Sequence, residues 1–241
     1  MHKCFGDYKK YCFYFLFFII TLVTFNSYAY SDGLTLHSTR VIFPEVKQKG
    51  VIYSISNNTD ELYLLQAQIK ELSTDNTMGN ISSKLIVVPP LQRFEPKQKI
   101  SLRLLLVDNT SLPKNRESVF LLILKAIPNN QDISQNDSTL QLAVQNNIKI
   151  FYRPIDIPDM TTAEINEKLV LSLENGHILV DNPTPYYITF ESIKVGDESL
   201  NNDKLSEMIP PFSKHSYIAP NNSVGKISWS ILNDYGEPIK K

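Results

Sequence analysis

The chain has 241 residues, of which 42% are hydrophobic and 20% are charged, and its formal net charge is −1. This composition excludes a disordered or collagen-like protein. The length suffices for two small domains or for one large β domain.

The first thirty residues differ from the rest of the chain. Lys3, Lys9 and Lys10 give a positive start, residues 11–25 form an uncharged and almost wholly apolar run, and small residues precede position 30. This layout is typical of a secretory signal peptide, whereas a membrane anchor would need about 20 apolar residues. We therefore predict a signal peptide over 1–29, cleavage after Ala29 and no stable membrane insertion.

The chain that follows this leader carries 21 basic and 24 acidic residues, a net charge of −3. This slightly negative net charge does not indicate a nucleic-acid-binding protein, which would carry an excess of basic residues. Both cysteines, Cys4 and Cys12, lie in the leader. The mature chain therefore has no disulfide and no thiol nucleophile, and its hydrophobic cores alone must hold it together.

The mature chain reads as β structure nearly throughout, because short apolar runs alternate with clusters of Asn, Asp, Ser and Pro. Strands are expected at 51–56, 62–72, 84–88, 100–107 and 119–127. Residues 129–139 form the most polar stretch and are expected to be a loop. In the segment 140–151, apolar residues recur with a period of two and only Asn146 interrupts the row, which is typical of a strand with one buried face.

A domain boundary is expected at 153–158, where two prolines deny ladder hydrogen bonds and stiffen an extended connector. Thr162 and Glu164 favour a short helix within 161–171. Regular short strands with polar turns favour β-sandwiches, and two of them would fill the mature chain. We therefore expect an all-β protein with domains at 30–153 and 154–241.

A search for chemical motifs finds none. The histidines His37, His177 and His215 have no paired metal-ligand spacing, and neither a nucleophile elbow nor a phosphate-binding glycine loop occurs. We expect no catalytic residue, metal or cofactor, and we expect that the protein is not an enzyme. Asn-x-Ser/Thr triplets such as those at Asn57, Asn80, Asn136 and Asn221 are expected by chance in so asparagine-rich a chain.

Six segments occur together in one order through the whole mature chain. The segments are 39–43, 89–96, 112–120, 148–154, 182–187 and 233–236. Together they resemble the signature of the periplasmic pilus chaperones of the chaperone–usher pathway, the PapD-like family. The resemblance implies two immunoglobulin-like β-sandwich domains at an angle, with a cleft between them, in a periplasmic protein.

The resemblance also implies a function and partners. Such chaperones bind unassembled pilus or fimbrial subunits by donor-strand complementation, in which a strand of the chaperone completes the subunit's open fold. They then deliver the subunits to an outer-membrane usher. Leu140, Leu142, Val144 and Ile148 are the expected donor-strand row, although an ordinary half-buried strand would show the same spacing.

Five charged residues acquire roles from the same resemblance. Arg40 and Lys149 match the basic pair that binds the C-terminal carboxylate of the subunit. Glu117, Arg153 and Asp234 match an ion network between the domains. The alternative for each is a solvated surface charge.

Two other classes of function stay open at this level. One is a secreted two-domain immunoglobulin-like adhesin or structural pilus component, and the other is an exported enzyme on a β scaffold. An exposed apolar strand edge also invites association, so we expect weak self-association through the donor strand.

Overall fold

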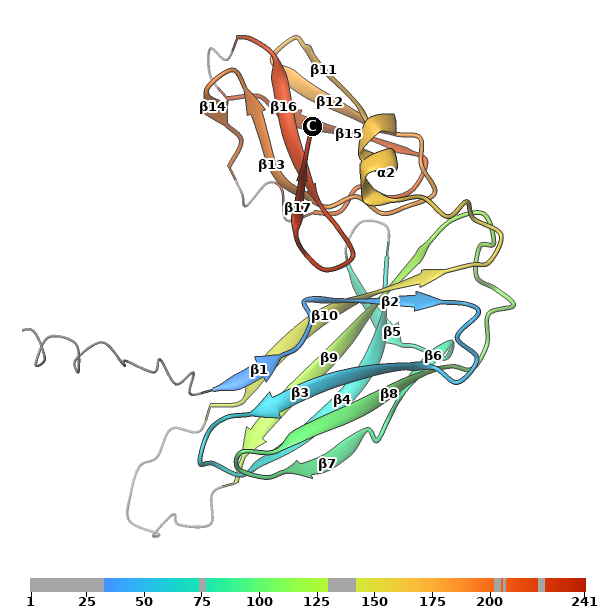
Figure 1. Cartoon of the computed structure of the whole chain (residues 1–241), viewed down its shortest axis with the longest axis vertical. Coiled ribbons are helices and arrows are strands. Elements are labelled where there is room, and N and C mark those ends of the chain that lie inside the picture. Colours follow the sequence, from blue (N-terminus) through green and yellow to red (C-terminus); the bar gives the residue numbers. More distant parts are fainter. Residues whose placement is uncertain (1–32, 74–76, 130–141, 202–204, 206, 221–223) are drawn as a thin grey trace, which may run out of the picture. The chain divides into compact units, whose positions relative to one another are not determined.

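The computed structural model describes residues 33–73, 77–129, 142–201, 205, 207–220 and 224–241 (Figure 1). Several predicted features lie outside the described residues. They are the signal peptide 1–29 with Cys4 and Cys12, most of the polar stretch 129–139, Leu140, and the triplets at Asn136 and Asn221.

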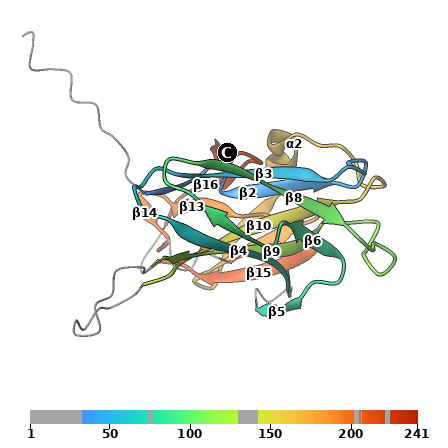
Figure 2. The same cartoon turned by 90° about the horizontal axis from the view of Figure 1, so that it is seen from below.

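The N-terminal half forms a sandwich of two sheets (Figures 1 and 2). One sheet has the order β1 (Leu34–Leu36), β3 (Val51–Asn57), β8 (Lys99–Leu106) and β6 (Leu85–Val88). The other has the order β2 (Arg40–Pro44), β10 (Val144–Arg153), β9 (Ser118–Pro128), β4 (Tyr63–Leu72) and β5 (Met78–Ile81), and β7 (Leu91–Phe94) also pairs with β4. Strand β2 runs parallel to β10, whereas the other named pairs are antiparallel.

Period-two alternation builds the core of this sandwich. In β8, Ile100, Leu102 and Leu104 are buried, whereas the residues between them are exposed. Phe43 and Ile150 are fully buried on the facing sheet. Each such side chain contributes about 1.5–3 kcal/mol when it leaves water, so the alternating rows hold the two sheets face to face.

The C-terminal half is a second sandwich. One sheet contains β11 (Val170–Glu174), β12 (His177–Asn182) and β15 (Ser213–Ile218). The other contains β14 (Glu198–Ser199), β13 (Phe190–Val195), β16 (Ile227–Leu232) and β17 (Pro238–Lys240). Helix α2 (Thr162–Lys168) precedes them and buries Ile165 in the core.

Helix α2 begins with a capping box. The Thr161 hydroxyl accepts from the Glu164 N–H, and the Glu164 carboxylate accepts from the Thr161 N–H at 2.7 Å. Reciprocal bonds of this kind satisfy two donors at a helix start that otherwise have no partner. The predicted helix is therefore confirmed, with its cap one residue earlier than the expected Thr162.

Both domains secure the end of one strand with a buried asparagine. Asn57 ends β3 and Asn182 ends β12, and neither side chain is exposed. Each amide donates to backbone carbonyls, and each Oδ1 accepts from the N–H and the hydroxyl of the threonine two residues later. The Asn57 amide is thus committed to the fold.

The five predicted strands are confirmed to within one residue at each end, as β3, β4, β6, β8 and β9. The predicted all-β class with two sandwich domains is also confirmed. Strand β10 ends at Arg153 and α2 begins at Thr162. The stretch 153–158, which contains two prolines, therefore lies in the connection between the two sandwiches.

Candidate functional site

Strand β10 has one complete and one incomplete edge. Along one edge it pairs with β9 from Val144 to Tyr152. Along the other edge it pairs with β2 only from Lys149 to Arg153. In the part of the chain that the structure describes, no strand covers this second edge over 144–148. Its backbone groups are therefore available to pair with another extended chain.

The side chains of this half-strand differ in burial along one face. Leu142 is 70% exposed and Val144 is 49% exposed. Ile148, which shares their period-two row, is buried in the core of its own domain. The prediction that Ile148 belongs to the exposed donor row is therefore wrong. The alternate side chains enter the sandwich core just before Lys149, where β2 begins to pair with β10.

Arg40 and Lys149 stand side by side at the point where β2 joins β10. Their Cα atoms are register partners in the parallel pair, and both side chains are half-buried. Among the described residues, neither side chain has an ion pair or donates a hydrogen bond. The Arg40 Nε is buried without an acceptor, and its guanidinium lies 5.7 Å from the centre of the Phe151 ring.

The electrostatics of this pair are unfavourable in the free protein. Burial lowers the pKa of Arg40, although the charges of Asp234 and Glu117 partly oppose this effect. Burial, and then the charge of Arg40, lowers the pKa of Lys149. Two partly desolvated cations thus lie next to each other without an anion between them, which is an arrangement that an anionic ligand would relieve.

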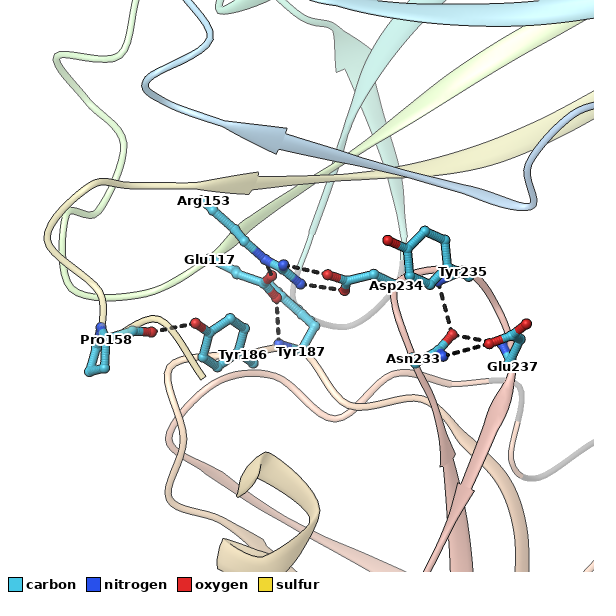
Figure 3. Close-up of polar contacts among 9 residues, drawn as sticks. All are labelled: Glu117, Arg153, Pro158, Tyr186, Tyr187, Asn233, Asp234, Tyr235 and Glu237. Atoms are coloured by element: carbon cyan, nitrogen blue, oxygen red, sulfur yellow. Dashed lines mark hydrogen bonds and ion pairs between the residues drawn. The ribbon is translucent and has the colours of Figure 1, made fainter. Parts of the chain in front are cut away.

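Glu117, Arg153 and Asp234 come together at the junction of the domains (Figure 3). The Arg153 Nε donates to Glu117 at 2.7 Å, and its two terminal nitrogens donate to the two Asp234 oxygens at 2.6 Å each. Glu117 also accepts from the N–H of Tyr187 at 2.8 Å. A forked guanidinium held by two carboxylates is among the stronger polar contacts in proteins.

The members of this network differ in burial. The Glu117 side chain is 1% exposed, and that of Asp234 is 40% exposed. Burial raises the pKa of Glu117, although the charge of Arg153 opposes that rise. Burial alone would lower the pKa of Arg153, but the hydrogen bonds with Asp234 and the charge of Glu117 outweigh it and raise that pKa.

Contacts that sequence reasoning missed surround the network. Arg153 lies over the Tyr186 ring, 5.1 Å from its centre, and the Tyr186 hydroxyl donates to the Pro158 carbonyl (Figure 3). Phe151 packs with Met208 and Val119 in a small apolar cluster across the domain junction. Tyr186 lies in segment 182–187, one of the six segments that resemble the chaperone family, and this was the only sequence signal for these contacts. No sequence pattern pointed to Met208.

A small pocket of about 30 Å³ opens at this junction, which is room for about one water molecule. Its lining includes Arg40, Arg153, Asp234 and Tyr187. Within the described ranges, no group of three or more His, Cys, Asp or Glu residues could hold a metal ion. No helix in those ranges is long and apolar enough to cross a membrane.

The fold and the site together define a class. It comprises proteins with two consecutive β-sandwich domains, an open strand edge in the first domain and a basic pair beside that edge. Residues 33–158 match the family model described as pili and flagellar-assembly chaperone, PapD N-terminal domain. Residues 164–241 match the model described as pili assembly chaperone PapD, C-terminal domain. The chain belongs to the PapD family of pilus-assembly chaperones.

Individual relatives extend this similarity over nearly the whole chain. The chaperone protein FocC of Escherichia coli is 35% identical over 221 residues, which cover 91% of each chain. The periplasmic chaperone SfaE has a TM-score of 0.70 and 31% identity over 87% of this chain and 98% of its own. A chain in the Salmonella enterica complex of the SafA pilin with the SafB chaperone has a TM-score of 0.74 and 26% identity, over 88% and 96%.

Proposed function

We propose that this protein is a periplasmic chaperone that binds unassembled pilus or fimbrial subunits through strand β10 and delivers them to an outer-membrane usher. One observation carries the proposal. The uncovered edge of β10 over 144–148 ends at Arg40 and Lys149, two cations without an anionic partner among the described residues. Membership of the chaperone family and the similarity to a chain of a chaperone–pilin complex support it.

The strand edge would complete the open fold of the subunit. Main-chain hydrogen bonds along the edge would pair with a subunit strand, while alternate side chains would enter the groove of the subunit. Leu142 and Val144 are the exposed members of the row, and Leu140 precedes them outside the described residues. Full burial of each such side chain contributes about 1.5–3 kcal/mol before the costs of association.

The basic pair would hold the terminal carboxylate of the subunit. Arg40 offers a planar fork for two parallel hydrogen bonds, and Lys149 adds a point charge. Each charge-assisted bond contributes about 1.5–3 kcal/mol. The pair would also set the register of pairing, because a slip by one residue would turn Leu142 and Val144 away from the groove.

The remaining features take supporting roles in this proposal. The network of Glu117, Arg153 and Asp234 would hold the C-terminal domain against the strands that carry Arg40 and Lys149. The leader 1–29 would export the chain and be removed. We further propose that the protein catalyses no reaction. The uncovered edge also predicts weak self-association, and a protein that sediments only as a monomer at high concentration would contradict this last point.

Affinity purification from the periplasm tests the proposal. Tagged wild type should recover a small β-sandwich subunit, and the Arg40→Ala/Lys149→Ala double variant should not. Lys125→Ala is the matched control, because this half-buried lysine lies on the neighbouring strand β9 and faces Gln66 and Gln145 in register. If the double variant and the control recover the subunit equally, the basic pair is not the anchor.

A second variant tests the strand edge itself. Val144→Arg should leave the fold intact, because Val144 is half exposed, but it should abolish recovery of the subunit. Retention of a receptor or a glycan in place of a subunit would instead favour the alternative of a secreted adhesin or structural pilus component.

A further inference from the structure

Tyr235 is presented to solvent by a firmly bonded turn. Its side chain is 81% exposed, and its hydroxyl makes no hydrogen bond within the part of the chain that the structure describes. The turn between β16 and β17 is tied by Asn233, whose Oδ1 accepts from the N–H groups of Tyr235 and Glu237 at 2.9 and 2.8 Å (Figure 3). The backbone N–H of Gly236 also donates to the Asn233 carbonyl at 3.0 Å.

Both neighbours of Tyr235 touch the strands that carry the basic pair. Asp234 binds Arg153 at the end of β10. Gly236, which has a φ of +84°, lies so close to Thr39 that an added Cβ would come within 2.7 Å of the Thr39 hydroxyl. Thr39 immediately precedes Arg40 in the chain.

The electrostatic and pocket contacts place the turn in the same neighbourhood. Asp234 and Arg40 line one pocket, and the charge of Asp234 acts on Arg40. Tyr235 directly follows Asp234, and consecutive Cα atoms are about 3.8 Å apart, so its backbone lies one residue from the pocket that Arg40 lines. A single exposed apolar residue needs no explanation by itself, so the case for Tyr235 rests on its place next to the pocket that Arg40 and Asp234 line.

We propose that Tyr235 packs its ring against the terminal residue of the bound subunit, beside the carboxylate that Arg40 and Lys149 hold. This inference rests on the proposed function and deepens it. A ring over the ion pair excludes water, and charge-assisted hydrogen bonds strengthen as water leaves. The flat apolar face suits a large aliphatic or aromatic side chain, so subunits that end in such a residue are the preferred partners.

A purely structural role for Tyr235 makes a different prediction. The turn is held through Asn233, Gly236 and the backbone, and none of these bonds uses the Tyr235 ring. Removing the ring should therefore leave the melting temperature unchanged, whereas a structural ring would lower it.

The experiment measures the dissociation rate of the subunit that copurifies with wild type, from immobilised wild type and three variants. Tyr235→Ala should dissociate about tenfold faster, as expected for an aromatic contact beside an ion pair. Tyr235→Phe should remain within about twofold of wild type, because it keeps the ring. Ile218→Ala is the matched control, since Ile218 is an exposed apolar residue of the same domain on β15.

A subunit variant completes a double-mutant cycle. Replacing the last residue of the subunit by glycine should erase the difference between wild type and Tyr235→Ala. The inference is overturned if Tyr235→Ala dissociates at the wild-type rate, if Tyr235→Phe is as impaired as Tyr235→Ala, or if the tenfold effect persists with the glycine variant.

The Arg40→Ala/Lys149→Ala variant separates this inference from the proposed function. If that variant loses the subunit while Tyr235→Ala does not, the carboxylate anchor stands and only the role of Tyr235 falls. If the double variant binds normally, the carboxylate anchor fails and the inference, which depends on that anchor, fails with it. If no subunit copurifies with wild type, the proposed function itself fails.

Discussion

Replacing Lys149 by methionine should stabilise the free protein while it abolishes subunit binding. Lys149 and Arg40 are register partners in neighbouring strands, and neither has an anionic partner among the described residues. Methionine keeps most of the length of the side chain and removes its charge. The like-charge repulsion and the cost of partial burial therefore disappear from the folded state.

The expected gain follows from Coulomb's law. Register partners on neighbouring strands start about 4.8 Å apart. Two unit charges that diverge from there to a separation of about 8 Å repel by about 2 kcal/mol at an effective dielectric constant of about 20. At about 0.15 M salt the Debye length is also about 8 Å, which reduces the repulsion to about 1 kcal/mol. A gain of about 1 kcal/mol raises the melting temperature of a chain of this size by about 2–4 °C.

The dependence on pH has a definite sign. Because the pKa of folded Lys149 is lowered, the unfolded chain binds more protons between that lowered value and the ordinary 10.5. The wild type therefore gains stability as pH rises through this window, and Lys149→Met has no corresponding gain. The difference in free energy of unfolding between the two proteins should shrink toward alkaline pH.

Denaturant unfolding of wild type, Lys149→Met and the control Lys125→Met measures these differences. The control should remain within about 0.5 kcal/mol of wild type. If Lys149→Met is no more stable than wild type at neutral pH, or if its advantage does not shrink in high salt, repulsion at the basic pair is not a feature of the free protein.

Three further variants test other parts of the structure. Glu117→Ala leaves Arg153 with one carboxylate and the Tyr187 N–H without its acceptor, and should cost about 3–5 kcal/mol in denaturant unfolding. Asn182→Asp removes the buried amide donor to the Tyr186 and Pro210 carbonyls, and should cost about 1–3 kcal/mol or more; a midpoint within error of wild type would contradict this. Lys241→Ala loses the ammonium that bonds three carbonyls at the end of α2, and should lower the melting temperature by the equivalent of about 0.3–1 kcal/mol.

Local patterns were sufficient to predict most of the fold. Short apolar runs bounded by polar clusters predicted strands such as β8, in which buried and exposed residues alternate in the structure. Thr162 and Glu164 predicted the start of α2 to within one residue, although the capping box that the structure shows pairs Glu164 with Thr161, three residues earlier. The register of pairings such as β10 with β2 did not follow from such patterns, since these strands are distant in the chain.

Ile148 shows where period-two reasoning ends. Only Asn146 interrupts the apolar row from Leu142 to Ile150, yet Leu142 is 70% exposed and Ile150 is fully buried. A side chain that packs into the core of its own domain and a side chain that inserts into the groove of a partner have the same polarity and the same spacing in the sequence. Only the point at which β2 begins to cover the edge of β10 separates them.

Contacts across the domain junction were equally beyond a sequence pattern. Phe212 adopts a φ of +53°, which is rare for a bulky residue, and Arg116 lies over its ring at 5.4 Å. Such a conformation persists only where the surrounding structure enforces it, and here the Phe212 N–H donates to the Thr184 carbonyl. The sequence carries no local signal for this conformation, because its cause is tertiary.

Three cations, Arg153, Arg40 and Lys149, lie in one small region but differ in the anions around them. This difference indicates what the site binds. Arg153 has two carboxylates, Glu117 and Asp234, directed at its guanidinium. Arg40 on β2 and Lys149 on β10 make no ion pair within the described residues, although the charges of Asp234 and Glu117 act on Arg40 from farther away. Selection for the stability of the free protein alone would favour neutralising or removing such a pair. Its presence beside an uncovered strand edge is explained if the missing anion arrives with a bound chain.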